Sequence, residues 1–212
     1  DYLYYTQADR EGRFTLPAVR EGDYTLYAYV NGVFGEYRKD GIQVNAKEPL
    51  DLGVLEWEPV NHGELAWQIG IPDRTPREFK YGENLHQWGL WLQYPLDFPE
   101  DVNFTIGKSD ERTDWNYAHP MVKTPGKTEQ LLVPANRSAA VWNIIFDREE
   151  AVSGTGTLTI AIAGSSNGSL NIELNGTQIA SYEKVIPIGN DASLYRAGEA
   201  GYYNELIIPF DA

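Results

Sequence analysis

Two segments alternate apolar and polar residues with a period of two, and this pattern limits the chain to an extended structure. They are TLTIAIAG, residues 157–164, and SLNIELNG, residues 169–176. Successive side chains of a strand point to opposite faces, so each segment is predicted to be a strand with one buried face. The inward-facing residues are Leu158, Ile160 and Ile162 in the first segment and Leu170, Ile172 and Leu174 in the second. The sequence shows no convincing helical period.

Turn signals connect the predicted strands. Asn175-Gly176 can adopt the positive φ angles of a tight hairpin turn, after which residues 177–182 return as a strand. We therefore expect a three-stranded meander over 157–182. In the N-terminal part we expect two short strands around the turn Arg20-Glu21-Gly22, and a further strand over 41–46.

The spacing of these signals predicts two domains. Pro59, Asn61, His62 and Gly63 form a short polar joint, so we expect a small, partial β-sandwich over 1–60 and a second domain over 61–212. About seven candidate strands with long, Pro-rich and Trp-rich connections are typical of a double-sheet jelly roll. The predicted fold class is all-β, with a small sandwich followed by a jelly-roll sandwich.

Charge and composition exclude several classes of partner. The net charge is −14, from 17 Lys and Arg against 31 Asp and Glu, and it repels nucleic acid and anionic lipid. The 212 residues include no cysteine and no apolar run of about eighteen residues, and they do not open on a leader-like segment. We expect no nucleic-acid partner, no membrane span and no disulfide framework.

Several motifs, in order along the chain, resemble one family. They are GRFTLPAVREGDYTLYAYVNGVFGEYRKDGIQV, DLGVLEWEP, LAWQIGIPDRTPREF, YPLDFPEDVNFTIGKSDERTDWNYA and GTLTIAIAGSSNGSLNIELNG. Together they resemble the C-terminal part of rhamnogalacturonan lyases of polysaccharide lyase family four. The resemblance implies a fibronectin-III-like domain followed by a jelly-roll domain similar to carbohydrate-binding modules. It also implies that the family's catalytic β-sandwich domain precedes Asp1, and that strands are missing at both ends of this chain.

The resemblance implies a function in pectin breakdown. We expect an accessory portion of a secreted, extracellular lyase that cleaves rhamnogalacturonan by β-elimination. The implied partners are the pectic polysaccharide and the missing catalytic domain or a complementary fragment. The alternative is a non-catalytic extracellular interaction or structural module that is unrelated to pectin and shares only the sandwich architecture.

Catalysis by this chain alone has little support in the sequence. β-Elimination needs a base and a cationic group close together. The three histidines, His62, His86 and His119, are expected to be ordinary surface or packing residues. No nucleophile elbow, phosphate loop or His-Glu-x-x-His segment occurs, so the chain alone is expected to be inactive.

Two clusters of basic residues are candidates for binding an acidic sugar. In GKSDERTDWNYA, Lys108 and Arg112 precede Trp115, Asn116 and Tyr117, which would supply charge, ring faces and an amide. Alternatively, Trp115 and Tyr117 seal a joint with the catalytic domain. The other cluster, in the segment after the joint, consists of Arg74, Arg77 and Lys80.

The segment AWQIGIPDRTPREF, residues 66–79, is predicted to be mainly structural. We expect Asp73-Arg74 to form a turn in which the carboxylate caps backbone N–H groups and the guanidinium braces the loop. Trp67 and Phe79 are expected to be buried on either side. A structural calcium held by Asp73 or Glu78 is a further candidate, although the dense oxygen-ligand pattern of calcium loops is missing from the sequence.

Four triplets fit the N-glycosylation pattern Asn-x-Ser/Thr. They begin at Asn103, Asn136, Asn167 and Asn175. They have meaning only for a secreted eukaryotic chain, and together with a polymeric extracellular substrate they favour secretion.

Overall fold

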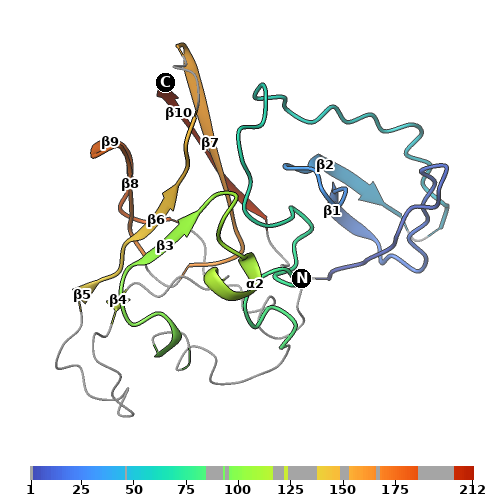
Figure 1. Ribbon diagram of the computed structural model, residues 1–212. Coiled ribbons are helices and arrows are strands. Elements are labelled where there is room, and N and C mark those ends of the chain that lie inside the picture. Colours follow the sequence, from blue (N-terminus) through green and yellow to red (C-terminus); the bar gives the residue numbers. More distant parts are fainter. Residues whose placement is uncertain are drawn as a thin grey trace. The chain divides into compact units, whose positions relative to one another are not determined.

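The computed structural model describes residues 2–45, 47–84, 93, 96–116, 122–123, 138–148, 153–165, 168–185 and 203–212. The chain divides into two compact units. Unit 1 comprises Asp1–Val30 and Gly35–Val60, and unit 2 comprises Asn31–Phe34 and Asn61–Ala212. Figure 1 shows the elements of both units along the chain.

Unit 1 contains an antiparallel pair of strands, β1 (Gly22–Ala28) and β2 (Tyr37–Val44). A β-bulge interrupts the register between Tyr24 and Leu26, and Gly41 adopts a φ of 70° on the opposing strand. A glycine suits this bulge because residues with a Cβ seldom adopt positive φ. The segment before Arg20, which was predicted to be a strand, is not one, whereas residues 41–44 of the strand predicted over 41–46 form the end of β2.

The inward face of this small sheet is narrow. Ile42 is the one buried apolar residue among the residues described in unit 1, and it lies opposite Tyr24 in the register. The ring of Tyr4 meets the ring of Tyr24 edge-on at 5.9 Å between centroids. A two-stranded sheet is marginal by itself, and the contact between Tyr4 and Tyr24 adds apolar packing to it.

Unit 2 confirms the predicted strands over 157–182 and corrects their pairing. β7 (Thr155–Ile162) pairs antiparallel with β10 (Asn204–Asp211) over eight residues, while β8 (Leu170–Leu174) forms a hairpin with β9 (Thr177–Tyr182). The three-stranded meander was therefore wrong, because β7 pairs with a strand about 40 residues further along. The predicted Asn175-Gly176 turn is confirmed by φ angles of 51° and 79°.

The core of unit 2 lies beside a parallel pair, β3 (Val102–Thr105) and β6 (Trp142–Ile145), which run side by side in Figure 1. Val102 and Phe104 alternate inward along β3 and are 4% and 3% exposed. β4 (Val122–Lys123) and β5 (Ser138–Ala139) form a short antiparallel pair, and the helix α2 (Glu111–Asp114) follows β3.

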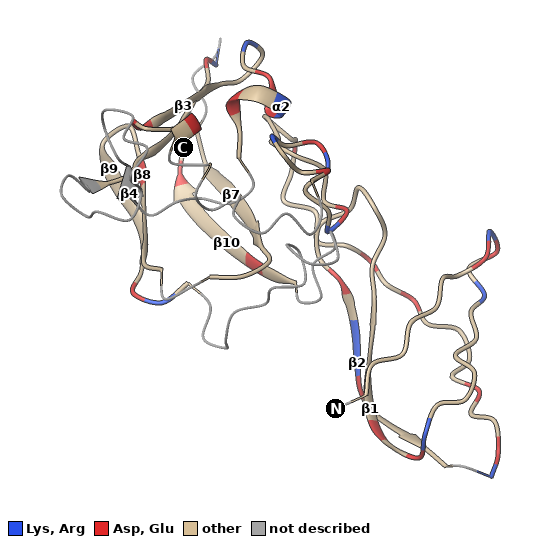
Figure 2. Ribbon diagram, turned by 90° about the horizontal axis from the view of Figure 1, so that it is seen from below, with Lys and Arg blue, Asp and Glu red and all other residues tan. Residues whose placement is uncertain are grey.

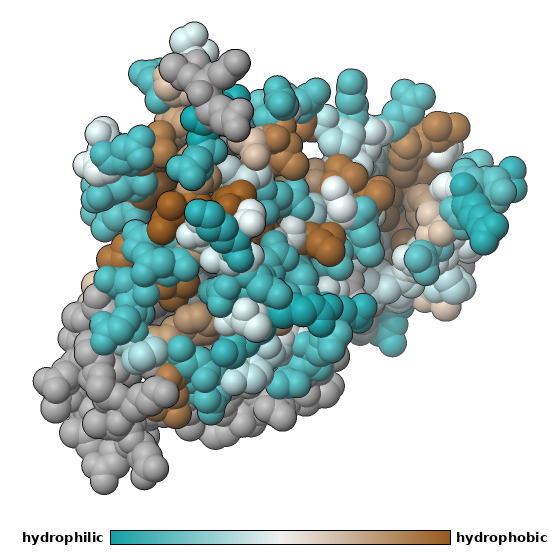
Figure 3. Space-filling view, in the orientation of Figure 1, coloured by the Kyte–Doolittle hydropathy of each residue, from teal (hydrophilic) through white to brown (hydrophobic). Residues whose placement is uncertain are grey.

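The all-β prediction is confirmed, since the described residues form ten strands and little helix, namely the four-residue helix α2 and the helical residues 93, 96 and 97. Much of the apolar surface stays accessible. Val141, Ile145 and Phe146 are 50%, 45% and 37% exposed on and beside β6. On the face in Figure 3, apolar side chains reach the surface in separate groups among hydrophilic ones.

Candidate functional site

The loop over residues 66–79 contains the predicted Asp73 turn. The Asp73 carboxylate accepts hydrogen bonds from the Thr75 backbone N–H and from the Thr75 hydroxyl, each at 2.8 Å. Arg74 adopts a φ of 65°, and its guanidinium carbon lies 5.2 Å from the centre of the Tyr203 ring. The carboxylate therefore caps the turn as predicted, and the cation lies over an aromatic ring that directly precedes β10.

The flanking aromatic residues of this loop are less enclosed than predicted. Trp67 and Phe79 are both half-buried, whereas the sequence led us to expect buried rings. Trp67 packs against Phe146 with ring centroids 5.4 Å apart. Phe79 approaches Gly70, where a side chain would overlap its ring. The two rings hold the loop in place but keep part of their surface in solvent.

Two glutamates hold the Gly70-Ile71 backbone. Glu111, the first residue of α2, accepts from the Gly70 N–H at 2.8 Å, and Glu78 accepts from the Ile71 N–H at 2.6 Å. Partial burial raises the pKa of Glu78, and the nearby charges of Asp73 and Glu111 act in the same direction, while the backbone hydrogen bonds oppose the change. Glu111 thus fixes the loop to the segment after β3, while Glu78 braces the loop from within.

The structural calcium stays a prediction, and these contacts bear on the two residues named for it. Calcium takes six to eight oxygen ligands, but Asp73 and Glu78 each direct a carboxylate oxygen at the backbone of their own loop. Within the described part of the chain, no group of three or more His, Asp or Glu side chains could hold a metal ion.

Lys108 and Arg112 lie on the exposed side of a tightly bonded turn. The Thr105 carbonyl accepts from the backbone N–H groups of Lys108 at 3.0 Å and Ser109 at 2.8 Å, and the Asp110 carboxylate caps α2 through the Arg112 N–H at 2.8 Å. Both basic side chains are exposed, and neither forms an ion pair with another described residue. Figure 2 shows positive and negative residues next to each other at α2.

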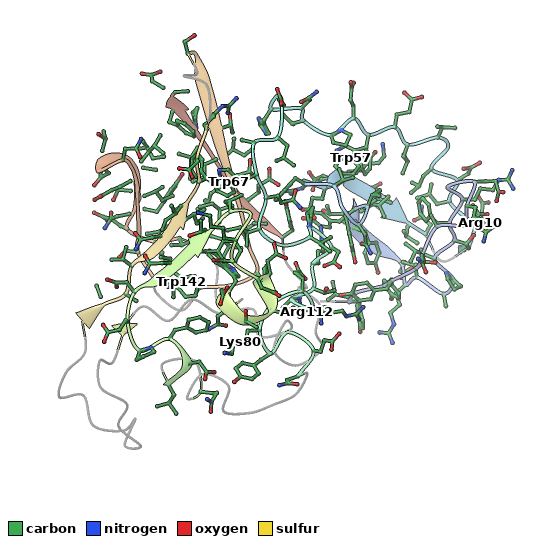
Figure 4. All side chains as sticks on the ribbon, viewed as in Figure 1. Arg10, Trp57, Trp67, Lys80, Arg112 and Trp142 are labelled. Carbon is green, nitrogen blue, oxygen red and sulfur yellow. The ribbon has the colours of Figure 1, made fainter. Side chains whose placement is uncertain are left out.

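A shallow, open cleft of about 430 Å³ lies between this turn and the 66–79 loop. Phe104, Ile106 and Gly107 line its apolar part, and the polar lining consists of Gln68, Glu78, Ser109, Asp110, Glu111 and Arg112. Three carboxyl groups and one guanidinium therefore meet in one depression. In Figure 4, Lys80 lies close to α2, the helix that contains Arg112.

Trp115 and Asn116 lie inside the fold. Trp115 is 8% exposed, and its ring meets the rings of Phe104 at 5.4 Å and Trp142 at 5.1 Å, both edge-on. Asn116 is fully buried and forms a parallel β-bridge with Lys80. Tyr117 lies outside the described residues. A sugar-stacking role for Trp115 stays a prediction, but a ring with so little exposure offers hardly any surface to a ligand.

The second basic cluster is spread over several neighbours. The Lys80 ammonium lies 5.5 Å from the Phe98 ring centre and 5.6 Å from that of Tyr81. Arg77 is exposed, and Arg74 lies over Tyr203 as described above. The Lys80 backbone N–H donates to the Trp115 carbonyl at 3.1 Å, and the cations of Lys80 and Arg74 lie against different aromatic rings.

Sequence reasoning missed Gln68, Ser109 and Glu111 as lining residues. A contact such as Gly70 to Glu111 joins residues 41 positions apart, and such pairs leave no periodic signal in a single sequence. His62 is exposed, while His86 and His119 lie outside the described residues. No helix in the part of the chain that the structure describes is long and apolar enough to cross a membrane.

Comparison with known protein families identifies the family of this chain. The family model "CBM-like: Polysaccharide lyase family 4, domain III" matches residues 65–212, and the model for domain II of the same family matches residues 1–52. The chain belongs to polysaccharide lyase family 4. The cleft therefore lies within the part that matches domain III of the family, and β1 and β2 lie within the part that matches domain II.

Individual relatives in family 4 agree with this assignment. The chain is 33% identical over 193 residues to "Probable rhamnogalacturonate lyase B" of Aspergillus terreus and 32% identical over 188 residues to "Rhamnogalacturonate lyase B" of Emericella nidulans; each alignment covers 82% of this chain and 28% of the relative. "Probable rhamnogalacturonate lyase C" of Aspergillus oryzae is 30% identical over 184 residues, covering 79% of this chain and 26% of the relative. The chain thus spans little more than a quarter of these proteins. No solved structure gives a significant match.

Proposed function

We propose that this chain is the accessory portion of a secreted rhamnogalacturonan lyase, and that the cleft beside α2 binds pectic glycan. Family membership supports the pectin context, because the relatives are named as rhamnogalacturonate lyases. The observation that carries the proposal is the cleft itself, which combines apolar lining residues with one cation, Arg112, and with hydrogen-bonding side chains.

The mixed lining suits a glycan that contains both neutral and acidic sugars. Arg112 and Lys108 can pair with the carboxylate of galacturonate, because charge-assisted hydrogen bonds are the strongest available at an exposed site. Gln68 and Ser109, together with the carboxylates, can bond the hydroxyl groups of rhamnose. Ile106, which is half-buried, offers an apolar surface to a sugar face.

The acidic residues of the cleft restrict where the uronate binds. Glu78, Asp110 and Glu111 repel a second carboxylate, so we place the galacturonate at Arg112, the one basic lining residue, with Lys108 on the adjoining turn. The net charge of −14 opposes a polyanion at long range. At 0.1 M salt, repulsion between charges more than about 10 Å apart is largely screened. The retention of the chain in a glycan gel should therefore increase as ionic strength rises from very low values.

Catalysis, in this proposal, belongs to another part of the parent protein. β-Elimination requires a base beside a group that neutralises the uronate carboxylate. We assign both groups, and the docking partner of this chain, to the catalytic domain that the family resemblance implies. Secretion is part of the same proposal, since pectin is an extracellular polymer.

Affinity electrophoresis in gels that contain rhamnogalacturonan tests the binding proposal. We expect the migration of the chain to be retarded, and the K108A and R112A variants each to bind roughly fivefold more weakly, which corresponds to about 1 kcal/mol for an exposed charged contact. R148A is the matched control, because Arg148 is an exposed arginine outside the cleft. An unretarded wild-type chain, or an R148A effect equal to that of R112A, would overturn the proposed site and favour the unrelated interaction module.

A further inference from the structure

We infer that Asn175 is an acceptor for an N-linked glycan, and that it is a better acceptor than Asn103. The triplet Asn175-Gly176-Thr177 forms the tip of the β8–β9 hairpin, where Leu174 pairs with Thr177. All three residues are exposed. The φ angles of 51° and 79° place the two central residues of the turn in the left-handed region, as in a two-residue hairpin turn.

The side chains of this triplet are uncommitted. Neither the Asn175 amide nor the Thr177 hydroxyl hydrogen-bonds to another residue within the described part of the chain. A two-residue turn projects beyond the ends of both strands, so a bulky group on Asn175 displaces no neighbouring strand. A glycan on Asn175 is therefore compatible with the folded structure, whether it is added before or after folding.

The proposed modification is a group transfer from a lipid-linked oligosaccharide diphosphate. A bond forms between the Asn175 Nδ2 and C1 of the first sugar, the bond between C1 and the diphosphate oxygen breaks, and the lipid diphosphate leaves. The amide nitrogen loses one proton to the transferase. No oxidant or reductant takes part.

Asn103, the other described candidate, lies in a different setting. It is the second residue of β3 and is flanked by the buried Val102 and Phe104. The side-chain oxygen Oδ1 of Asn103 accepts a hydrogen bond from the side-chain amide of Asn143 at 2.9 Å across the parallel pair. The Thr105 backbone N–H donates to the Ser109 hydroxyl at 2.9 Å. Asn103 is itself exposed, but the triplet is held in the sheet by these contacts, so we expect a lower occupancy than at the Asn175 turn. The triplets at Asn136 and Asn167 extend outside the described residues.

The acceptor and the cleft are compatible. The β8–β9 hairpin lies away from α2 in both Figure 1 and Figure 2, so a glycan on Asn175 leaves the cleft beside α2 accessible. The inference rests on the secretion that forms part of the proposed function, because the glycan is added only in the secretory pathway.

Secreted expression of the full chain in yeast, behind a heterologous leader, tests the inference. The leader makes the result independent of the native location. Glycopeptide mass spectrometry, after enzymatic removal of N-glycans in heavy-oxygen water, reports the occupancy of each site. An occupied asparagine is converted to an aspartate that contains heavy oxygen. We expect most molecules to carry this label at Asn175 and a smaller fraction to carry it at Asn103.

Two variants control for folding. N175D removes the acceptor but keeps a side chain that tolerates positive φ, and T177V removes the hydroxyl but keeps a β-branched residue. We expect both variants to lose the label at residue 175 and to melt within about 3 °C of the unglycosylated wild-type chain. The N103D variant should keep the label at Asn175. An unmodified Asn175 in the folded, secreted protein, or an Asn103 occupancy equal to or above that of Asn175, would overturn the inference. Binding to pectin is read separately on the gel, so the two proposals fail independently.

Discussion

Replacing Trp115 with alanine tests whether this residue belongs to the core or to a ligand surface. Its ring is 8% exposed and makes edge-on contacts with Phe104 and Trp142. A tryptophan buries roughly 200 Å², which at about 25 cal/mol per Å² corresponds to roughly 5 kcal/mol. Measured losses for such changes are about 3–5 kcal/mol, including the cavity. We expect W115A to lose about 4 kcal/mol.

Thermal unfolding followed by tryptophan fluorescence measures this loss. Five of the six tryptophans lie in unit 2, so the signal reports mainly on the unit that contains Trp115. For a domain of this size each kcal/mol lowers the melting temperature by about 2–4 °C, so W115A should melt roughly 10 °C or more below the wild-type chain. W115F keeps one ring and should lose less than half as much.

F146A is the matched control, because Phe146 is 37% exposed and its contact with Trp67 lies outside the Trp115 cluster. We expect its melting temperature to fall by less than half as much as that of W115A. A W115A chain that melts within about 2 °C of the wild type but is no longer retarded in a rhamnogalacturonan gel would refute our assignment of Trp115 to the core.

Three further predictions address the strands and the loop. In G156A a methyl group meets the ring of the cross-strand partner Phe210, so we expect the free energy of unfolding in urea to fall by about 1–3 kcal/mol. In an F210A background G156A should cost nothing further, and additive losses would contradict the contact. Because the pKa of Glu78 is raised above its ordinary 4.5, the folded chain binds that proton more tightly than the unfolded chain, and the stability from this group falls as pH rises through the raised pKa. E78Q keeps an acceptor for the Ile71 N–H and should show a smaller fall in melting temperature between pH 4 and pH 7; identical pH profiles would argue against this cause. N143A removes the hydrogen bond to Asn103 and should cost about 0.5–1.5 kcal/mol in urea unfolding, whereas an unchanged midpoint would mean that the pair adds nothing.

The local features of the fold could be predicted because their signals are local. The alternation over 170–174 is matched by a burial pattern in which Leu170, Ile172 and Leu174 are the more enclosed residues. The Asn175-Gly176 turn needs positive φ at two positions, and this sequence supplies the residues that adopt it most easily. Asp73 likewise caps the turn two residues on, as its side-chain chemistry predicts.

The long-range features could not be predicted in the same way. The pairing of Ile162 with Asn204 and the parallel pairing of Val102 with Trp142 each join residues about 40 positions apart. The composition around Trp115 is compatible with a surface platform and with a core, and only the positions of Phe104 and Trp142 decide between them. Distant contacts of this kind set the cleft, so the sequence named Arg112 as a candidate but could not name the residues that lie opposite it.

The absorbance of unsaturated uronate in the ultraviolet, measured while the purified chain is incubated with rhamnogalacturonan, tests the central claim most directly. The same sample is then run on the affinity gel, so that binding and cleavage are read from one preparation. Our account predicts a flat absorbance trace and retarded migration, because the chain binds the glycan and leaves β-elimination to another domain. A steady rise in absorbance that increases with the concentration of the chain would contradict it.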